Sequence, residues 1–144
     1  MRVLVQRSGK SNVSIDKKIA GKIDDGLVLF VGFTEGDTIE EIKYLVKKIL
    51  HLRIFPDENG VMNKSILDYG GSVLSISQFT LYADTTKGNR PSYIGAMKGE
   101  KAINLYRLFN EELKKYITVA TGEFGADMIV SISNIGPTTI LLEK

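Results

Sequence analysis

Cysteine and histidine, the side chains that most often serve as activated nucleophiles, general bases and zinc ligands, are nearly absent from this sequence. The 144 residues include no cysteine and one histidine, His51, which excludes thiol chemistry and a histidine–cysteine zinc site within one chain. A serine or threonine nucleophile paired with an imidazole would have to use His51, which lies among apolar residues in ILHLRIF (49–55). We interpret His51 as a partly buried structural histidine, because histidine is often semi-buried.

The stretch GGSVLSISQFTLYAD (70–84) breaks the pattern of a regular strand. Leu74 and Ile76 lie on one face of a predicted strand, and the same face continues with the polar Gln78. The apolar phase therefore changes at Ser77–Gln78. Such a change is typical of a bulge, a strand end or the wall of a pocket, and the pattern alone leaves these alternatives open.

A second break lies in SISNIGPTTILLEK (131–144), where Gly136 and Pro137 interrupt the alternation of a strand. Proline cannot donate a ladder hydrogen bond and glycine packs no side chain, so a central strand should contain neither. Asn134 and the threonines that follow can bond nearby backbone groups. The segment is either a turn between two strands or a constrained backbone that faces a ligand.

The loop DTTKGNRPSYIGAMKGE (84–100) lies between these two stretches. It carries Lys87, Arg90 and Lys98, and its only acids are Asp84 and Glu100. A solvated loop and a phosphate-contacting lip beside a pocket both agree with this composition.

The elements that must position these residues can be predicted from periodicity and turn signals. Apolar residues recur at helical spacing after Thr38, and Thr38-x-x-Glu41 fits a capping box. Turns are indicated near Asp16 and at Asn59–Gly60. We predict strands at 2–8, 11–16, 18–24, 26–33, 126–133 and 138–144, and helices at 36–50 and 99–116.

Length and composition indicate a single domain over residues 1–144 with an ordinary globular core. Several strands precede the first helix, so the fold class is α/β (α+β-like): a mixed, largely antiparallel curled sheet or half-barrel with two main helices. The net charge of +2 is too small to indicate a general nucleic-acid binder. The N-terminus is too short and polar for a signal peptide, and we expect a cytoplasmic protein.

Two motifs together resemble the D-aminoacyl-tRNA deacylase (D-tyrosyl-tRNA deacylase) family. The segments QRSGKSNVSID (6–16), TTKGNRPSY (85–93) and TGEFGADMIVS (121–131) also resemble that family, in its order, so the similarity covers essentially the whole chain. The motifs are Ser-Gln-Phe-Thr and Asn-x-Gly-Pro-x-Thr, which are here Ser77, Gln78, Phe79 and Thr80, and Asn134, Gly136, Pro137 and Thr139.

The resemblance implies a cis Gly136–Pro137 bond that reaches across a homodimer interface into the partner's pocket. Arg7 would hold this element by bonding its carbonyls. Phe124 and Met128 would pack beside it, and Ala102 would line the pocket from the second helix.

The resemblance also implies the substrate, a D-amino acid esterified to the 3′-terminal adenosine of a tRNA. A fixed backbone would exclude L side chains sterically, and glycine would pass. We expect the amides of Phe79 and Thr80 to stabilise the oxyanion, with Thr80 either a nucleophile or structural. Lys87 and Arg90 would contact the acceptor end. No cofactor, metal, membrane or DNA partner is expected.

Two alternatives remain from the sequence. One is a related editing deacylase that removes L-alanine from mischarged tRNA through a trans Gly-Pro element. The other is a non-catalytic RNA-binding dimer module on the same fold, because fold alone does not determine function.

Overall fold

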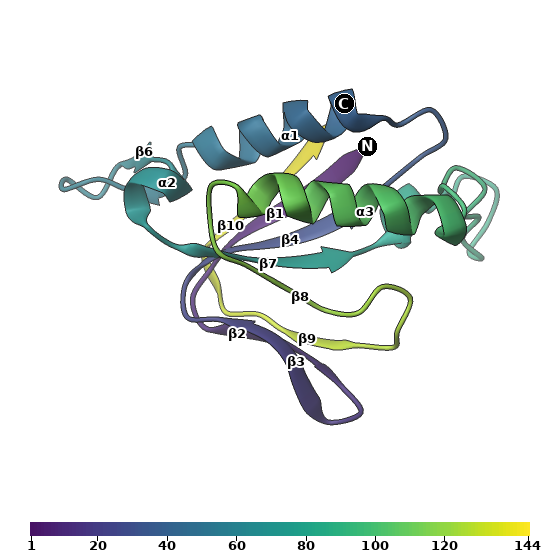
Figure 1. Cartoon of the computed structure of the whole chain (residues 1–144), viewed down its shortest axis with the longest axis horizontal. Coiled ribbons are helices and arrows are strands. Elements are labelled where there is room, and N and C mark those ends of the chain that lie inside the picture. Colours follow the sequence, from purple (N-terminus) through teal and green to yellow (C-terminus); the bar gives the residue numbers. More distant parts are fainter.

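The main sheet of the computed structural model, which describes residues 1–144, has five strands in the order β10–β1–β4–β7–β8 (Figure 1). The antiparallel pairs are β10–β1 and β1–β4, whereas β7 runs parallel to both β4 and β8. The strands span Arg2–Ser8 (β1), Gly26–Gly32 (β4), Ser72–Ser77 (β7), Val119–Thr121 (β8) and Asn134–Glu143 (β10). The run of apolar residues in β4 thus occupies the centre of the sheet, where both faces are covered.

A second sheet of three strands has the order β3–β2–β9. Its strands are Ser11–Ile15 (β2), Lys18–Ile23 (β3) and Ile129–Ser131 (β9). Asp16 and Lys17, with φ of 48° and 65°, form the predicted two-residue turn between β2 and β3. A small hairpin of Phe55–Pro56 (β5) and Met62–Lys64 (β6) contains Gly60, with φ of 77°, at the predicted turn.

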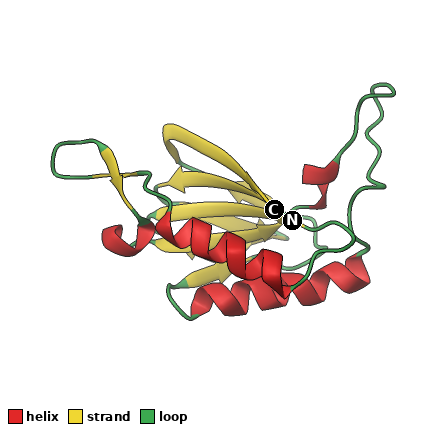
Figure 2. Cartoon of the chain, turned by 90° about the horizontal axis from the view of Figure 1, so that it is seen from above, coloured by secondary structure: helices red, strands yellow, loops and turns green.

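The two main helices, α1 (Ile39–His51) and α3 (Gly99–Lys114), lie on the same side of the main sheet (Figure 2). The start of α1 is the predicted capping box: the N–H of Glu40 donates to Thr38 Oγ1, and the N–H of Thr38 donates to Glu41 Oε2 at 2.8 Å. A single turn, α2 (Ile66–Tyr69), follows β6.

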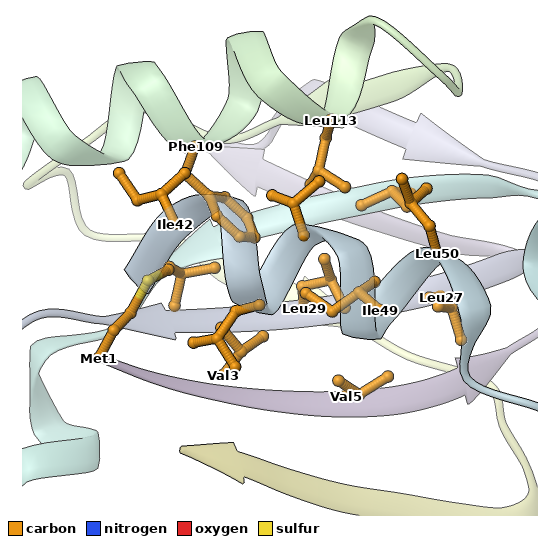
Figure 3. Close-up of a cluster of buried hydrophobic side chains, with 14 of the residues drawn as sticks. Met1, Val3, Val5, Leu27, Leu29, Ile42, Ile49, Leu50, Phe109 and Leu113 are labelled. Atoms are coloured by element: carbon orange, nitrogen blue, oxygen red, sulfur yellow. The ribbon is translucent and has the colours of Figure 1, made fainter. Parts of the chain in front are cut away.

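Apolar side chains from both helices and the sheet form the larger of two cores (Figure 3). Phe109 and Ile49 come from the helices, and Val3 and Leu29 come from alternate positions of β1 and β4. The opposite face of the sheet contributes Val28, Leu74 and Ile76 to a second cluster, which β2 and β3 close with Val13 and Ile23. Because Val73 belongs to the larger core, β7 is held by buried side chains on both of its faces.

The predicted mixed sheet with two main helices is confirmed, and the sheets do not close into a barrel. The short elements α2 and β8 were not predicted. His51 is exposed at the C-terminal end of α1, so its interpretation as partly buried is wrong. None of the helices combines the length and apolar character needed to span a membrane.

Candidate active site

The segment Ser77–Thr80 begins where β7 ends. Ser77 is the last residue of β7, and the chain turns into a short 3₁₀ helix, η1 (Phe79–Tyr82). The N–H of Gln78 donates to the carbonyl of Val31 at 2.7 Å and closes the strand. The change of apolar phase at Ser77–Gln78 therefore marks a strand end, one of the predicted alternatives.

Gly32 allows this turn to pack against β4. A Cβ at position 32 would lie 2.8 Å from the carbonyl oxygen of Gln78, closer than a side chain tolerates. The close approach explains why position 32 needs a glycine, which the sequence alone did not indicate.

A cavity of about 670 Å³ opens beside the turn, and its lining is mostly apolar. Ser77, Gln78 and Phe79 form one wall. Six of the residues predicted for the site thus come together in the cavity lining: Ser77, Gln78, Phe79, Ala102, Phe124 and Met128. Thr80 does not line the cavity, and its Oγ1 accepts a hydrogen bond from Gln78 Nε2.

The deep wall comes from α3 and from the segment that follows β8. Ala102 is buried in the first turn of α3. The ring of Phe124 lies 5.8 Å, centroid to centroid, from that of Tyr106. The Tyr106 hydroxyl donates to the carbonyl of Ser75 at 2.8 Å, and burial raises the pKa of Tyr106. Phe124 is therefore supported by a tyrosine that β7 fixes and that stays neutral.

The mouth of the cavity is aromatic and basic. Phe79 is 57% exposed and meets Tyr93 edge to face, with ring centroids 5.0 Å apart. Lys98 lies in the lining, and Lys87 and Arg90 are exposed on the adjoining loop. None of these three cations forms an ion pair. Tyr93 was not predicted as a site residue, although an aromatic side chain beside a basic loop is a recognisable signal.

Gly136 and Pro137 lie in β10, at the edge of the main sheet. Ser8 pairs with Asn134 and Gln6 pairs with Thr139, so residues 135–138 bulge out of the ladder. The peptide bond between Gly136 and Pro137 is cis, and Gly136 has φ of 116°. The Gly-Pro segment is thus neither a central strand nor a turn between strands, but an exposed bulge in an edge strand.

Asn134 and Arg7 hold this bulge from two sides. Asn134 Oδ1 accepts from the N–H of Thr138 at 3.2 Å, and its Nδ2 donates to Thr139 Oγ1 at 2.8 Å. Arg7 Nε donates to the carbonyl of Ile135 at 3.3 Å, and its Nη1 donates to that of Ile54 at 2.6 Å. Arg7 therefore bonds one carbonyl of the bulge and ties it to the segment after α1, but the carbonyls of Gly136 and Pro137 are not its acceptors.

Within one chain the bulge and the cavity lie at opposite ends of the sheet. The strand register connects the two: Ser8 pairs with Asn134 on one side and with Gly26 on the other, and Gly26 pairs with Ser72 of β7. Gln78 lies six residues further along the chain than Ser72. That offset amounts to about 20 Å along the strands at ~3.3 Å per residue. The Gly-Pro bulge and Arg7 therefore do not reach the cavity of their own chain, and Phe124 and Met128 do not pack beside them there.

The cavity lining carries the hydrogen-bonding groups of Ser77 and Gln78, and its charged side chains are Lys98 and Asp127. No group of three or more His, Cys, Asp or Glu side chains lies close enough together to hold a metal ion. The amides of Phe79 and Thr80 are the first in η1, and the first amides of a helical turn have no acceptor within the helix. Such a site can orient a reactive ester and stabilise negative charge on it.

Comparison with known proteins agrees with this architecture. A family model described as D-Tyr-tRNA(Tyr) deacylase matches residues 4–143. The chain is similar to a solved structure named "c-Myc DNA Unwinding Element Binding Protein", with 38% identity over 100% of this chain and 99% of that one, and a TM-score of 0.95. A structure named "Structural Analysis of a probable eukaryotic D-amino acid tRNA deacylase" shares the fold at 17% identity, covering 98% and 97% of the two chains, with a TM-score of 0.83.

Proposed function

The chain belongs to the D-Tyr-tRNA(Tyr) deacylase family, hydrolases that act on the ester bonds of D-aminoacyl-tRNA, and we propose that the cavity beside Ser77, Gln78 and Phe79 is where it does so. The observation that carries this proposal is the convergence of the Ser77–Phe79 segment with Ala102, Phe124 and Met128 around one cavity. The proposed reaction releases a D-amino acid from the 3′-terminal adenosine of tRNA.

The cavity suits the terminal adenosine in size and character. Its volume of about 670 Å³ lies within the range of small-molecule sites. Phe124 and Met128 offer apolar and aromatic surface on which a base can stack, and Ala102 leaves room for it. The basic side chains of Lys87, Arg90 and Lys98 at the mouth would meet the phosphates that precede the adenosine.

The chemistry needs little from side chains, because an aminoacyl ester is already activated. Water adds to the ester carbonyl carbon and releases a proton, and the amide of Phe79, which lines the cavity, donates to the oxygen that becomes negative. Thr80 lies outside the lining, so we do not assign its amide to the oxyanion. The bond from the carbonyl carbon to the ribose oxygen then breaks, and that oxygen takes up a proton. The neighbouring ribose 2′-hydroxyl assists this transfer, so no histidine or cysteine is required.

We assign Thr80 a structural role. Its hydroxyl lies outside the cavity lining and accepts a hydrogen bond from Gln78 Nε2. The side chain that bonds this hydroxyl is the amide of Gln78, which is a donor and not a base that could activate a nucleophile. The interaction fixes the amide of Gln78 at the cavity wall.

Discrimination between D and L substrates requires a second copy of the chain. The Gly136–Pro137 bulge is exposed and about 20 Å along the strands from its own cavity, so it can act only on the cavity of a partner. In the proposed homodimer its rigid backbone occupies the space that an L side chain would need, while a D side chain points to solvent. Glycine, which has no side chain, would pass the same filter.

Both ends of the chain belong to one sheet, because β1 pairs with β10, and we therefore also propose that residues 1–144 form one domain. The substrate places the protein where tRNA is aminoacylated, which we propose is the cytoplasm.

Deacylation assays with D-Tyr-tRNA, Gly-tRNA and L-Ala-tRNA test this function against its alternatives. We expect hydrolysis of the D ester, slower hydrolysis of the glycyl ester and none of the L-alanyl ester. Cleavage of L-Ala-tRNA alone would identify the related editing deacylase. Binding of all three without cleavage would identify a non-catalytic RNA-binding module.

A further inference from the structure

A second hollow, with a volume of about 540 Å³, lies along the C-terminal half of α1. We name it the α1 basic hollow. Its lining contains no acidic residue and consists of Tyr44, Lys47, Lys48, His51, Leu52 and Arg53. In a chain whose net charge is only +2, this is a local concentration of positive charge.

The cations of the hollow are not neutralised by carboxylates. Neither Lys47 nor Lys48 forms an ion pair, whereas Lys43 on the preceding turn pairs with Glu40 at 3.8 Å. The nearby Asp68 carboxylate bonds the backbone and side chain of Ser65 and forms no ion pair with a cation of the hollow. The positive charge of the hollow therefore faces solvent.

Arg53 is held in place by neutral groups. Its Nε donates to the carbonyl of Asn63 at 2.9 Å, and its Nη2 bonds Asn63 Oδ1. A guanidinium has five N–H donors, so further donors remain in a fixed orientation. A fixed, incompletely used guanidinium is suited to binding a phosphate.

The dipole of α1 does not account for the whole cluster. Lys48 and His51 lie in the last turn, where a cation stabilises a helix. Lys47 lies before that turn, and Arg53 lies beyond the end of the helix. Stabilisation of the helix dipole therefore does not explain why Lys47 and Arg53 line the same hollow as Lys48 and His51.

We propose that the α1 basic hollow binds the phosphate backbone of the substrate tRNA, outside the terminal nucleotides that enter the cavity. The inference rests on the proposed function. Arg53 precedes Ile54, whose carbonyl accepts from Arg7, and Arg7 also holds Ile135 in the Gly-Pro bulge. Hydrogen bonds of Arg7 therefore connect the segment next to the hollow with the bulge. In the proposed dimer, where the bulge contacts the partner's cavity, the hollow would lie near the RNA bound in that cavity.

The test compares two double variants of equal charge. Lys47→Gln/Lys48→Gln alters the hollow, and Lys18→Gln/Lys22→Gln removes two exposed, unpaired lysines from β3. The Kd for deacylated tRNA is measured by fluorescence anisotropy over a series of salt concentrations. Hydrolysis is measured with D-Tyr-tRNA and with the D-tyrosyl ester of adenosine, which has no stem to reach the hollow.

We expect the hollow variant to bind tRNA several-fold more weakly, with its salt slope reduced by about 2, one for each lysine. Its kcat/KM should fall to the same extent on D-Tyr-tRNA and stay at the wild-type value on the adenosine ester. The β3 variant should match the wild type in every measurement.

Unchanged tRNA affinity in the hollow variant, or equal losses in both variants, would overturn the proposal. A loss of affinity for a DNA duplex with tRNA affinity intact would instead make the hollow a DNA surface. If the wild type hydrolyses neither ester, the proposed function fails, and the binding data still decide the role of the hollow.

Discussion

The proposed exclusion of L substrates depends on the backbone conformation of Gly136. Its φ of 116° is one that residues with a Cβ rarely adopt. A Cβ there would lie 2.7 Å from Thr138 Oγ1 and 2.8 Å from Arg7 Nη2, so both groups that shape the bulge would have to move.

Gly136→Ala is therefore expected to displace the bulge and to weaken the exclusion of L substrates. We expect the ratio of D-Tyr-tRNA to L-Tyr-tRNA hydrolysis to fall at least tenfold, equivalent to about 1.4 kcal/mol of discrimination. Gly60→Ala serves as control, because Gly60 also has a positive φ but lies in the β5–β6 turn with open space around it. An undiminished ratio in Gly136→Ala would show that the bulge does not filter substrates.

A substitution of Thr80 tests whether its hydroxyl has a structural role or acts as a nucleophile. Thr80→Val keeps the shape of the side chain but removes the acceptor for Gln78 Nε2. We expect kcat to stay within about tenfold of the wild type, whereas loss of a true nucleophile costs on the order of 10⁶. Single-turnover hydrolysis of D-Tyr-tRNA measures the difference, and a loss of the larger size would restore Thr80 as nucleophile.

At the residue scale, the sequence and the family resemblance predicted six of the 19 residues that line the cavity. The polar break at Ser77–Gln78 was visible because it interrupts a strand pattern. Ala102, Phe124 and Met128 were predicted only through the family resemblance, since small and apolar residues look the same in a cavity as in a core. The role of Gly32 depends on an approach to Gln78 from another strand, which spacing along the chain cannot reveal.

The capping box of α1 is a local interaction that the sequence predicted and that can be tested by itself. Thr38→Ala removes the side-chain acceptor for the N–H of Glu40, and we expect the free energy of unfolding to fall by about 1 kcal/mol. Urea unfolding at neutral pH measures this change, and Thr38→Ser, which keeps the hydroxyl, should retain most of the stability. Equal stability of all three proteins would contradict the cap.

The same cap predicts a dependence on pH. Hydrogen bonds from Thr38 lower the pKa of Glu41 below its usual 4.5, because they stabilise the carboxylate. A lowered pKa in the folded state contributes stability above the unfolded pKa, and this contribution is lost as the pH falls through the folded value. The difference between wild type and Thr38→Ala should therefore shrink in acid, and a constant difference down to pH 3 would contradict this explanation.

At the element scale, long periodic segments were predictable and short ones were not. The helix predicted at 99–116 is found as Gly99–Lys114, because its apolar stripe spans several turns. α2, β8 and η1 have three or four residues each, too few for a period to emerge. β10 can contain Gly136–Pro137 because it is an edge strand. Its edge position depends on how the whole sheet is assembled, so the sequence of the segment did not predict it.

The whole molecule leaves one apolar row of the sheet uncovered. Leu4 and Leu141 pair on the face opposite the helices, and neither belongs to a buried cluster. Phe30, which pairs with Leu4 on the other side, packs against the second cluster, so the uncovered part of the row is Leu4 and Leu141. Leu141 is 48% exposed and Ile135, in the bulge, is 49% exposed. This row adjoins the bulge and is the surface through which we expect two copies to meet.

A mixed dimer tests whether the bulge acts across that interface. Differently tagged Gln78→Ala and Gly136→Ala chains are co-expressed, and the heterodimer is isolated by both tags. Its one intact cavity should receive the wild-type bulge of the Gln78→Ala chain and recover the wild-type D-to-L ratio. The Gln78→Ala homodimer, checked to be inactive, is the control. A heterodimer as unselective as Gly136→Ala alone would show that the bulge does not act in trans.

A bulge that acts on the cavity of a partner was predicted only through the family resemblance and not from the pattern of residues. The two motifs lie more than fifty residues apart in the chain, and only the strand register shows that they occupy opposite ends of the sheet. The fold class followed from the order of elements, whereas the proposal of a second copy is supported by the distance between the bulge and the cavity within one chain.

The most direct test of the account is hydrolysis of D-Tyr-tRNA and L-Tyr-tRNA by the wild-type chain under identical conditions. The account predicts rapid loss of the D ester and stability of the L ester at the rate of the buffer control. Hydrolysis of both esters would contradict the proposed filter. Stability of both, with tRNA still bound, would contradict the proposed catalysis in this chain.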